Sequence, residues 1–356
     1  MTELTETVPM TSATDAADAP TTEPVLEVSG LTVHFSPPGG SEPVPLVRDA
    51  SFAIGAGEVV CLVGESGSGK SVTSQAIMRL IQEQPTISAA GTVRFMGRDV
   101  LSASHQEIRN IRGRDMAIVF QEPMSSLDPV YTIENQMVEA IRRADDVSAK
   151  AARARANDLL TKVGISGTER TLRSYPHQLS GGMCQRVMIA MALACQPRLL
   201  IADEPTTALD VTIQAQILEL LADLRREFGM AMLLVTHDMG VAAQVADRVV
   251  VMYAGRVVEE ARTADLFRAP MHPYTAGLLN CIPPLSGERT TMLPAIAGNV
   301  PEPRWLPAGC AFHPRCHAAV EKCSAEDPPL RLVDSRPVAC WRAPELHGAL
   351  DPVRTP

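Results

Sequence analysis

A glycine-rich stretch in the first quarter of the chain, GESGSGKS at residues 64–71, restricts the possible folds more than any other feature. It follows an apolar, β-branched run at 58–63 and precedes residues 72–81, whose apolar positions recur at helical spacing. This succession predicts a strand, a loop with the spacing G-x-x-x-x-G-K-S and a helix, which together form a phosphate-binding loop. Glycines let successive backbone N–H groups turn towards an anion at the helix N-terminus.

The residue types in this loop indicate a nucleoside triphosphate as the ligand. Lys70 is expected to reach the β- and γ-phosphates, and the Ser71 hydroxyl to bind Mg²⁺. A Gly/Ser loop that precedes a capped helix by chance is the alternative, and the strand–loop–helix context disfavours it. The predicted ATP contacts are Gly64, Glu65, Ser66, Gly67, Ser68, Gly69, Lys70 and Ser71.

Two further apolar runs end in polar side chains. Residues 198–203 end at Asp203, which Glu204 follows, and the run at 230–236 is followed by His237. Taken alone, charged residues often close strands, and a lone histidine is more often a surface or packing residue. Open α/β sheets, however, bind ligands at the carboxyl ends of their strands. Beside a phosphate loop, Asp203 is therefore expected near Mg²⁺ and Glu204 near the attacking water.

A second pair of glycines lies at a predicted helix start, in LSGGM at residues 179–183. Ser180 is the expected N-cap of a helix with apolar residues at helical spacing. A capped core helix is the plain interpretation. Adjacent glycines also let a phosphate approach the N–H groups, which suggests a second anion site and a nucleotide bound across a dimer.

Together these motifs resemble those of ABC transporter ATPase subunits, over about residues 25–260. The order matches throughout: GESGSGKS, VFQEP, LSGGM, LLIADEP, TALD and a histidine after the last core strand. Met183 departs from the pattern, because most family members have glutamine there. The resemblance implies ATP hydrolysis, with Glu204 as general base, His237 at the γ-phosphate, and Gln121 attending Mg²⁺ and the water with Asp203. It also implies nucleotide contacts from Phe35, Gln121, Ser180, Gly181, Gly182, Met183 and Asp210.

The expected fold class is α/β, a P-loop ABC ATPase core with a RecA-like sheet, an antiparallel β lobe and a helical subdomain. The β lobe is expected from about 25–57 and 91–119, and the helical subdomain from about 122–178. Residues 122–133 are the predicted contact with a membrane permease. The low-hydrophobicity acidic tail at 1–24 is expected to be disordered.

The C-terminal part, residues 261–356, is expected to form a small cysteine-bearing domain. Its beginning, LFRAPMHPYTAGLLNCIPPL at 266–285, resembles the extension of oligopeptide and dipeptide importer ATPases. This resemblance implies peptide import, with nickel chelates and other small solutes as the cargo of known relatives. The implied partners are a second ATPase subunit, identical or homologous, two transmembrane permease subunits and an extracytoplasmic substrate-binding protein.

Composition argues against several other classes of protein. The net charge of -9 disfavours nucleic acid as a partner, and no apolar run is long enough to span a bilayer. No signal-peptide pattern is present, so we expect a peripheral protein at the cytoplasmic face of the membrane. A DNA-repair or translation ATPase of this type would need a long coiled-coil insertion or a second cassette. A GTPase would need an N-K-x-D motif, which the chain lacks.

Half of the 8 cysteines lie near the C-terminus, at Cys310, Cys316, Cys323 and Cys340. A disulfide is disfavoured in a reducing cytosol, and incidental free thiols remain an alternative. Four thiolates in a lobe with few apolar residues suit a metal, although the spacings lack the close pairs usual in structural zinc sites. Four cysteines can hold a [4Fe–4S] cluster, and importer ATPases that resemble this chain can carry one here. We favour this cluster, with zinc, joined by His313 or His317, as the alternative.

Overall fold

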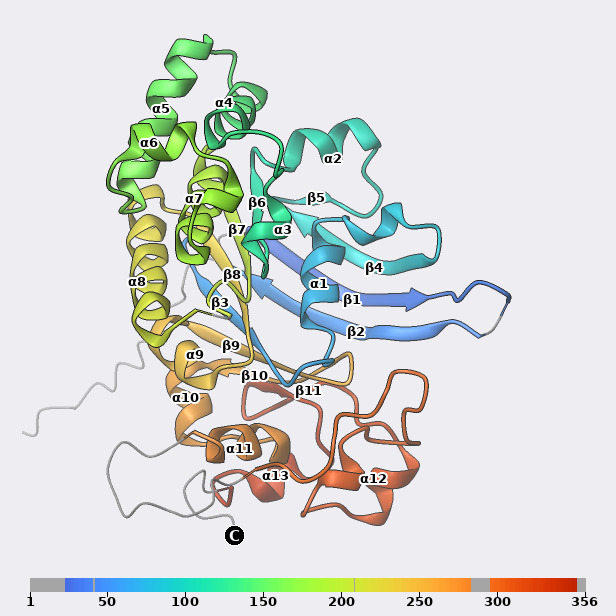
Figure 1. Cartoon of the computed structure of the whole chain (residues 1–356). Helices are drawn as coiled ribbons and strands as arrows, with labels where there is room; N and C mark the ends of the chain where they lie inside the picture. Colours follow the sequence, from blue (N-terminus) through green and yellow to red (C-terminus); the bar gives the residue numbers. More distant parts are fainter. Residues whose placement is uncertain (1–22, 41, 208, 283–294, 351–356) are drawn as a thin grey trace, which may run out of the picture.

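The structure is a computed structural model that describes residues 23–40, 42–207, 209–282 and 295–350. It contains two β-sheets, a group of helices beside the larger sheet and a C-terminal segment below them (Figure 1). Nearly all of the acidic tail expected at residues 1–24 lies outside the described residues, so that expectation stays a prediction.

The smaller sheet is antiparallel and has the strand order β2-β1-β4-β5. Its strands are β1 (Leu26–Phe35), β2 (Val44–Ile54), β4 (Ile87–Phe95) and β5 (Arg98–Asp99). The short helix α2 (His105–Ile111) follows, with a capping box at Ser104. The sequence predicted this lobe to extend to about residue 119. That bound is wrong, because β6 (Met116–Val119) pairs in parallel with β7 of the larger sheet.

The larger sheet has the order β11-β12-β10-β9-β3-β8-β7-β6. Its parallel part consists of β9 (Arg248–Tyr253), β3 (Val59–Val63), β8 (Ala231–Thr236), β7 (Leu199–Asp203) and β6. Every residue of β3, β7 and β8 is buried, as expected for parallel strands covered on both faces. These strands match the apolar runs that predicted them.

Alternate side chains of β3 pack in two different hydrophobic cores. Cys61 and Val63 pack with the helices, whereas Val60 and Leu62 pack with the antiparallel sheet. Helix α1 (Lys70–Ile77) lies between the two sheets and contacts strands of both. The other face of the larger sheet is covered by α7 (Gly181–Leu193), α8 (Val211–Phe228) and α9 (Met239–Val245). The phosphate loop before α1 is thus held between two packed cores.

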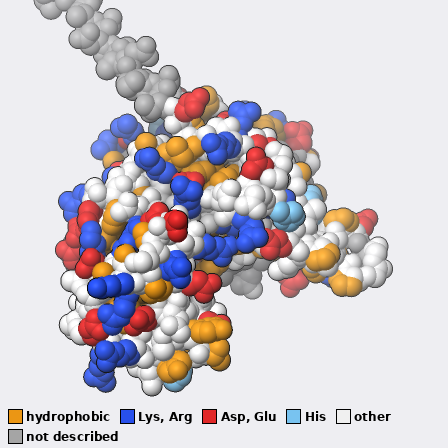
Figure 2. Space-filling model, turned by 90° about the horizontal axis from the view of Figure 1, so that it is seen from above, with side chains coloured by type: hydrophobic (Ala, Val, Ile, Leu, Met, Phe, Trp, Pro, Cys, Tyr) orange, Lys and Arg blue, Asp and Glu red, His pale blue; other side chains and the backbone are white. Residues whose placement is uncertain are grey.

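Four helices lie within the range expected for a helical subdomain: α3 (Pro123–Ser126), α4 (Ile133–Ala144), α5 (Ala149–Lys162) and α6 (Thr168–Arg173). Serine and threonine side chains cap α4 and α5, which explains where these two helices begin. Figure 2 looks down on this end of the molecule, where basic and acidic side chains alternate over the surface.

The C-terminal segment builds onto the larger sheet. It contains β10 (Arg256–Arg262), α10 (Thr263–Arg268), α11 (Pro273–Asn280), α12 (Glu321–Ala325), β11 (Arg331–Val333), β12 (Arg336–Val338) and α13 (Ala343–Leu346). The hairpin β11–β12 extends the sheet, because Glu259 of β10 pairs with Val338 of β12. The separate small domain expected from the sequence is therefore not confirmed.

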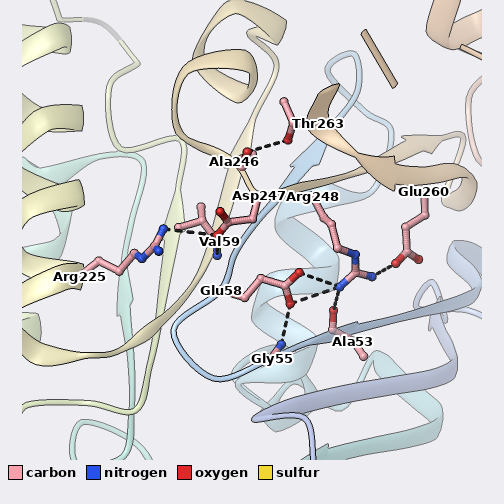
Figure 3. A network of polar contacts seen from close by, with 10 residues as sticks. All are labelled: Ala53, Gly55, Glu58, Val59, Arg225, Ala246, Asp247, Arg248, Glu260 and Thr263. Atoms are coloured by element: carbon pink, nitrogen blue, oxygen red, sulfur yellow. Dashed lines mark hydrogen bonds and ion pairs between the residues drawn. The ribbon is translucent and has the colours of Figure 1, made fainter. Parts of the chain in front are cut away.

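A polar network around Arg248 ties β9 of the larger sheet to β2 of the antiparallel sheet (Figure 3). Its guanidinium donates to the carbonyl of Ala53 at 3.2 Å and to the carboxylate of Glu58 at 3.0 Å, and it also pairs with Glu260. Beside it, the Asp247 carboxylate accepts a hydrogen bond from the Val59 amide at 2.8 Å. These contacts fix β3, and with it the start of the phosphate loop, relative to both sheets.

Candidate functional site

The phosphate loop takes a shape that only glycine permits at two positions. Gly64 and Gly69 have φ values of 155° and 98°. A Cβ atom on Gly64 would lie 2.2 Å from the carbonyl oxygen of Met252, and one on Gly69 would lie 2.9 Å from that of Leu46. The loop is therefore packed against neighbouring backbone on its outer side, with α1 beginning directly after it.

The Lys70 side chain folds back onto the backbone of the phosphate loop. Its ammonium donates hydrogen bonds to the carbonyl oxygens of Gly64 at 2.7 Å and Glu65 at 3.0 Å. Burial lowers the pKa of Lys70, whereas the carboxylates of Glu204 and Asp203 oppose that shift. A buried ammonium held by loop carbonyls lies where phosphate oxygens can replace those carbonyls as acceptors.

Asp203 faces two hydroxyl groups from the first turn and a half of α1. Ser71 Oγ donates to its Oδ1 at 2.9 Å, and Ser74 Oγ donates to its Oδ2 at 3.3 Å. Burial raises the pKa of Asp203, and the two hydroxyl donors oppose this shift. A carboxylate and a hydroxyl are oxygen ligands of the kind that Mg²⁺ binds beside nucleotide phosphates, so the donor set fits this ion.

Glu204 is held by three side chains. The amide of Gln121 donates to Oε2 at 3.0 Å, and the hydroxyl of Thr207 donates to the same oxygen at 2.8 Å. Nδ1 of His237 lies 3.3 Å from the other oxygen, Oε1. Glu204 is only 9% exposed and has φ 46°, a left-handed conformation that is unfavourable for a non-glycine residue. Such strain is common at functional sites.

Sheet topology explains why these residues meet. Strands β6, β7 and β8 are parallel neighbours, so their carboxyl ends share one edge of the sheet. Gln121, Glu204 and His237 each follow one of these three strands. The sequence predicted these three residues to act together, and the fold brings them into contact. It did not predict Thr207, although a hydroxyl three residues after Glu204 was a readable signal, or Ser74, one turn after Ser71.

Three other residues predicted to contact the nucleotide are Ser180, Asp210 and Phe35. The Ser180 hydroxyl accepts a hydrogen bond from the Met183 amide at 3.3 Å, so the predicted N-cap of α7 is confirmed. Asp210 caps α8 by accepting from the Ile213 amide at 2.9 Å. Phe35 lies half-buried at the end of β1. Within the described residues, no hydrogen bond or ion pair joins Ser180 or Asp210 to the phosphate loop.

The C-terminal segment also reaches the phosphate loop, through two residues that the sequence did not indicate. The amide of Glu65 donates to the Tyr274 hydroxyl at 2.8 Å. The Arg315 guanidinium donates to both carboxylate oxygens of Glu65, at 2.8 and 3.0 Å. These pairs are 209 and 250 residues apart in sequence, so neither spacing nor periodicity could reveal them.

The four C-terminal cysteines lie around one small cavity. The Gly309 backbone, at φ 69°, lets the Cys310 amide donate to the Cys323 carbonyl at 2.8 Å. The cavity has a volume of about 20 Å³, room for about one water, and its cysteines are Cys310, Cys316, Cys323 and Cys340. Across the described ranges, no group of three or more His, Cys, Asp or Glu residues is arranged to hold a metal ion. The expected cluster or zinc site is thus not supported by this geometry.

A larger cavity, of about 630 Å³, lies at the far edge of the larger sheet. It is lined by residues of β10, α10 and the β11–β12 hairpin and contains none of the motif residues. Two of its arginines, Arg248 and Arg336, are paired with carboxylates. The chemistry of the site lies instead at the phosphate loop and the ends of β6, β7 and β8.

No helix in the described part of the chain is both long and apolar enough to cross a membrane.

Residues 47–207 match the ABC transporter family, and residues 258–323 match the family described as "Oligopeptide/dipeptide transporter, C-terminal region". The second match covers the segment that carries Tyr274 and Arg315.

Two curated relatives are similar over almost their whole length. The oligopeptide transport ATP-binding protein AppD of Bacillus subtilis is 50% identical, over 89% of this chain and 96% of that protein. The dipeptide transport ATP-binding protein DppD of Escherichia coli is 48% identical, over 89% and 96%. Among solved structures, the dimeric ATP-binding cassette MJ0796 bound to ADP and Pi has a TM-score of 0.59 and 30% identity. It covers 67% of this chain and 98% of its own.

Proposed function

The chain belongs to the oligopeptide/dipeptide transporter family of ABC ATP-binding proteins, and we propose that it hydrolyses ATP to drive peptide uptake through a membrane permease. One observation carries the catalytic part: Gln121 and His237 converge on the carboxylate of Glu204 beside Lys70 and Asp203. The similarity to transport ATP-binding proteins along nearly their full length supports the choice of peptides as cargo.

Nucleotide binding starts at the phosphate loop. The Lys70 ammonium exchanges the carbonyls of Gly64 and Glu65 for phosphate oxygens, which form stronger, charge-assisted hydrogen bonds. Ser71, Asp203 and Gln121 are the residues that would hold Mg²⁺. When bound, this ion neutralises negative charge on the phosphates. By the family resemblance, Phe35 stacks on the adenine.

Glu204 is the proposed general base for hydrolysis. Two donors, Gln121 and Thr207, bond to Oε2, whereas Oε1 has only the His237 ring beside it at 3.3 Å, so Oε1 is the proposed acceptor of the proton from the attacking water. As the O–H bond of the water breaks, its oxygen attacks the γ-phosphorus and the bond to ADP breaks. His237, next to Oε1, is placed to contact the γ-phosphate.

We further propose that two ATPase subunits bind ATP between them. Gly181 and Gly182 at the start of α7 present N–H groups that can cover the ATP of the partner subunit. A Cβ on Gly181 would meet no atom within 4 Å, so this surface is open in the single chain. The similar cassette MJ0796 is itself dimeric, which supports this arrangement. Ser180, Met183 and Asp210 would line the same interface.

The permease contact is proposed at residues 122–133, at the cytoplasmic face of the membrane. Apolar side chains are exposed there: Met124 at 46%, Val130 at 71% and Tyr131 at 53%. Three exposed apolar side chains within one short segment support a protein contact here. Two transmembrane subunits and an extracytoplasmic substrate-binding protein would complete the importer, and they would choose the peptide.

A deletion strain tests the proposed cargo. Cells without the chain should lose uptake of a labelled dipeptide or oligopeptide, and the wild-type chain but not Glu204→Gln should restore it. Nickel uptake, measured in parallel, should not change. Lost nickel uptake with normal peptide uptake would replace peptides by metal chelates as cargo. Co-purification of the chain with ribosomes or DNA, rather than with a multi-spanning permease, would contradict transport.

We propose separately that Cys310, Cys316, Cys323 and Cys340 bind a [4Fe–4S] cluster, with zinc as the alternative. In support, all four thiols line one cavity. Against it, the cavity is too small for a cluster unless the thiols separate. Burial also raises the pKa of Cys310 to about 12 and that of Cys316 to about 11, so metal binding must remove their protons. No catalytic step depends on this group.

Metal analysis of anaerobically purified protein decides between the alternatives. A brown protein with iron and acid-labile sulfide, both lost in Cys316→Ser, would support the cluster. Stoichiometric zinc in a colourless protein would support the zinc site. Metal-free protein with a folded C-terminal segment would contradict both.

A further inference from the structure

Arg315 is held on several sides in the C-terminal segment. Its Nε donates to the carbonyl of Ala297 at 2.8 Å, and its guanidinium lies 5.8 and 5.9 Å from the ring centres of Tyr253 and Phe312. The side chain is only 5% exposed. These contacts restrict the orientation of the guanidinium. The C-terminal segment therefore preorganises it for its two hydrogen bonds to Glu65.

Glu65 is a negative charge within a loop that must bind negative phosphates. Its own carbonyl accepts from the Lys70 ammonium at 3.0 Å, so the residue lies directly at the phosphate-binding lysine. An unpaired carboxylate there would repel ATP, whose phosphates carry several negative charges. The bidentate pair with Arg315 cancels this charge. Because the Arg315 side chain is nearly buried and the Glu65 side chain is 30% exposed, salt screens the pair less than it would a fully exposed pair.

Glu65 is also fixed by its backbone. Its amide donates to Tyr274, a residue of α11 that is fully buried against Tyr253 and Phe312. The same aromatic group supports Arg315. One rigid cluster of the C-terminal segment therefore holds both the backbone and the side chain of a single phosphate-loop residue.

We propose that Arg315 is a positioning residue for the ATP site: it neutralises and orients the Glu65 carboxylate, and so sets the affinity of the phosphate loop for ATP. This proposal rests on the proposed function, because it concerns the same nucleotide site. It gives the C-terminal segment a part in nucleotide binding that is independent of any metal at the cysteines.

ATPase kinetics of the full chain in its transporter complex test the proposal. Arg315→Ala should raise the KM for ATP on the order of 10-fold, with kcat at saturating ATP nearly unchanged. Arg315→Lys keeps the charge but loses the bidentate geometry, so its KM for ATP should lie between those of the wild type and Arg315→Ala. Arg331→Ala is the control, because this exposed guanidinium of the same segment contacts the Trp341 carbonyl instead.

The decisive variant is the double substitution Glu65→Gln with Arg315→Ala. If the effect is electrostatic, removal of the carboxylate should restore the KM for ATP to near the wild-type value. A raised KM that the double variant does not restore would show a purely structural role and overturn the proposal, as would an unchanged KM in Arg315→Ala. If Arg315→Ala does not fold, the same comparison is made with Arg315→Lys.

Failure of this proposal is distinct from failure of the proposed function. A wild-type chain that hydrolyses ATP while Arg315→Ala has the same KM leaves the ATPase assignment intact. A wild-type complex that does not hydrolyse ATP would contradict the function itself.

Discussion

The side-chain amide of Gln121 donates a hydrogen bond of 3.0 Å to Glu204 across 83 residues of sequence. The bond joins the ends of two neighbouring parallel strands, β6 and β7. The helical subdomain, where permease contact is proposed, begins directly after Gln121. A movement of α3 or α4 that displaces Gln121 would therefore change the orientation of the Glu204 carboxylate. This contact offers a direct physical link between the permease and ATP hydrolysis.

Thr207→Val should slow hydrolysis without weakening ATP binding. The substitution keeps the shape of the side chain but removes the hydroxyl that donates to Glu204 Oε2 at 2.8 Å. Loss of one hydrogen bond to a charged group predicts a fall in kcat on the order of 10-fold. Thr206→Val, whose hydroxyl bonds to no described residue, is the control. A kcat equal to that of the wild type would show that Thr207 does not orient the carboxylate.

Gly181→Asp should block closure of the ATPase dimer while each chain still binds ATP. The added side chain meets no atom within 4 Å in its own chain, so the fold should tolerate it. Across the interface, the new carboxylate would oppose the γ-phosphate bound by the partner subunit. Sedimentation with ATP should show monomers, and calorimetry should show normal ATP affinity. Equal loss of ATP affinity would place the α7 start in the site of its own chain.

His272→Asn should make folding stability less sensitive to acid. Burial lowers the pKa of His272 to about 3, so the folded chain keeps this ring neutral while the unfolded chain protonates it below its ordinary value. The stability that depends on the neutral ring is present at pH 7.5 and is lost as the pH falls from about 6.5 towards 3. At pH 5 the loss should approach about 2 kcal/mol.

His272 is the N-cap of α11, and its Nδ1 accepts a hydrogen bond from the Tyr274 amide at 3.0 Å. Asparagine is a matched replacement because it also caps helices well. Urea unfolding at pH 7.5 and 5.0 measures the difference. The wild type should lose more stability than the variant between these values. Equal losses of stability in the wild type and the variant would mean that protonation of His272 does not destabilise the folded chain.

The apolar runs predicted the strands β3, β7 and β8, and the strand ends along one sheet edge predicted that Glu204 and His237 lie at the ligand site. Only the family resemblance indicated Gln121. The sequence also predicted a metal site at the four C-terminal cysteines. They line one cavity, but the described residues do not have metal-binding geometry, because spacing alone does not determine how loops fold. The sequence missed the contacts of Arg315 and Tyr274 with Glu65 because these depend on how the C-terminal segment docks. Long-range docking of this kind leaves no local pattern in a single sequence.

Glu204→Gln should leave ATP binding intact and stop hydrolysis, because Glu204 is the proposed base that activates water in an otherwise complete ATP site. Phosphate release and ATP affinity are measured on one sample of the variant transporter complex. ATP affinity should be near that of the wild type, and phosphate release should be lower by roughly 10²–10⁴-fold. Lys70→Ala, in contrast, should weaken ATP binding itself. Phosphate release by Glu204→Gln at the wild-type rate would show that Glu204 is not the general base.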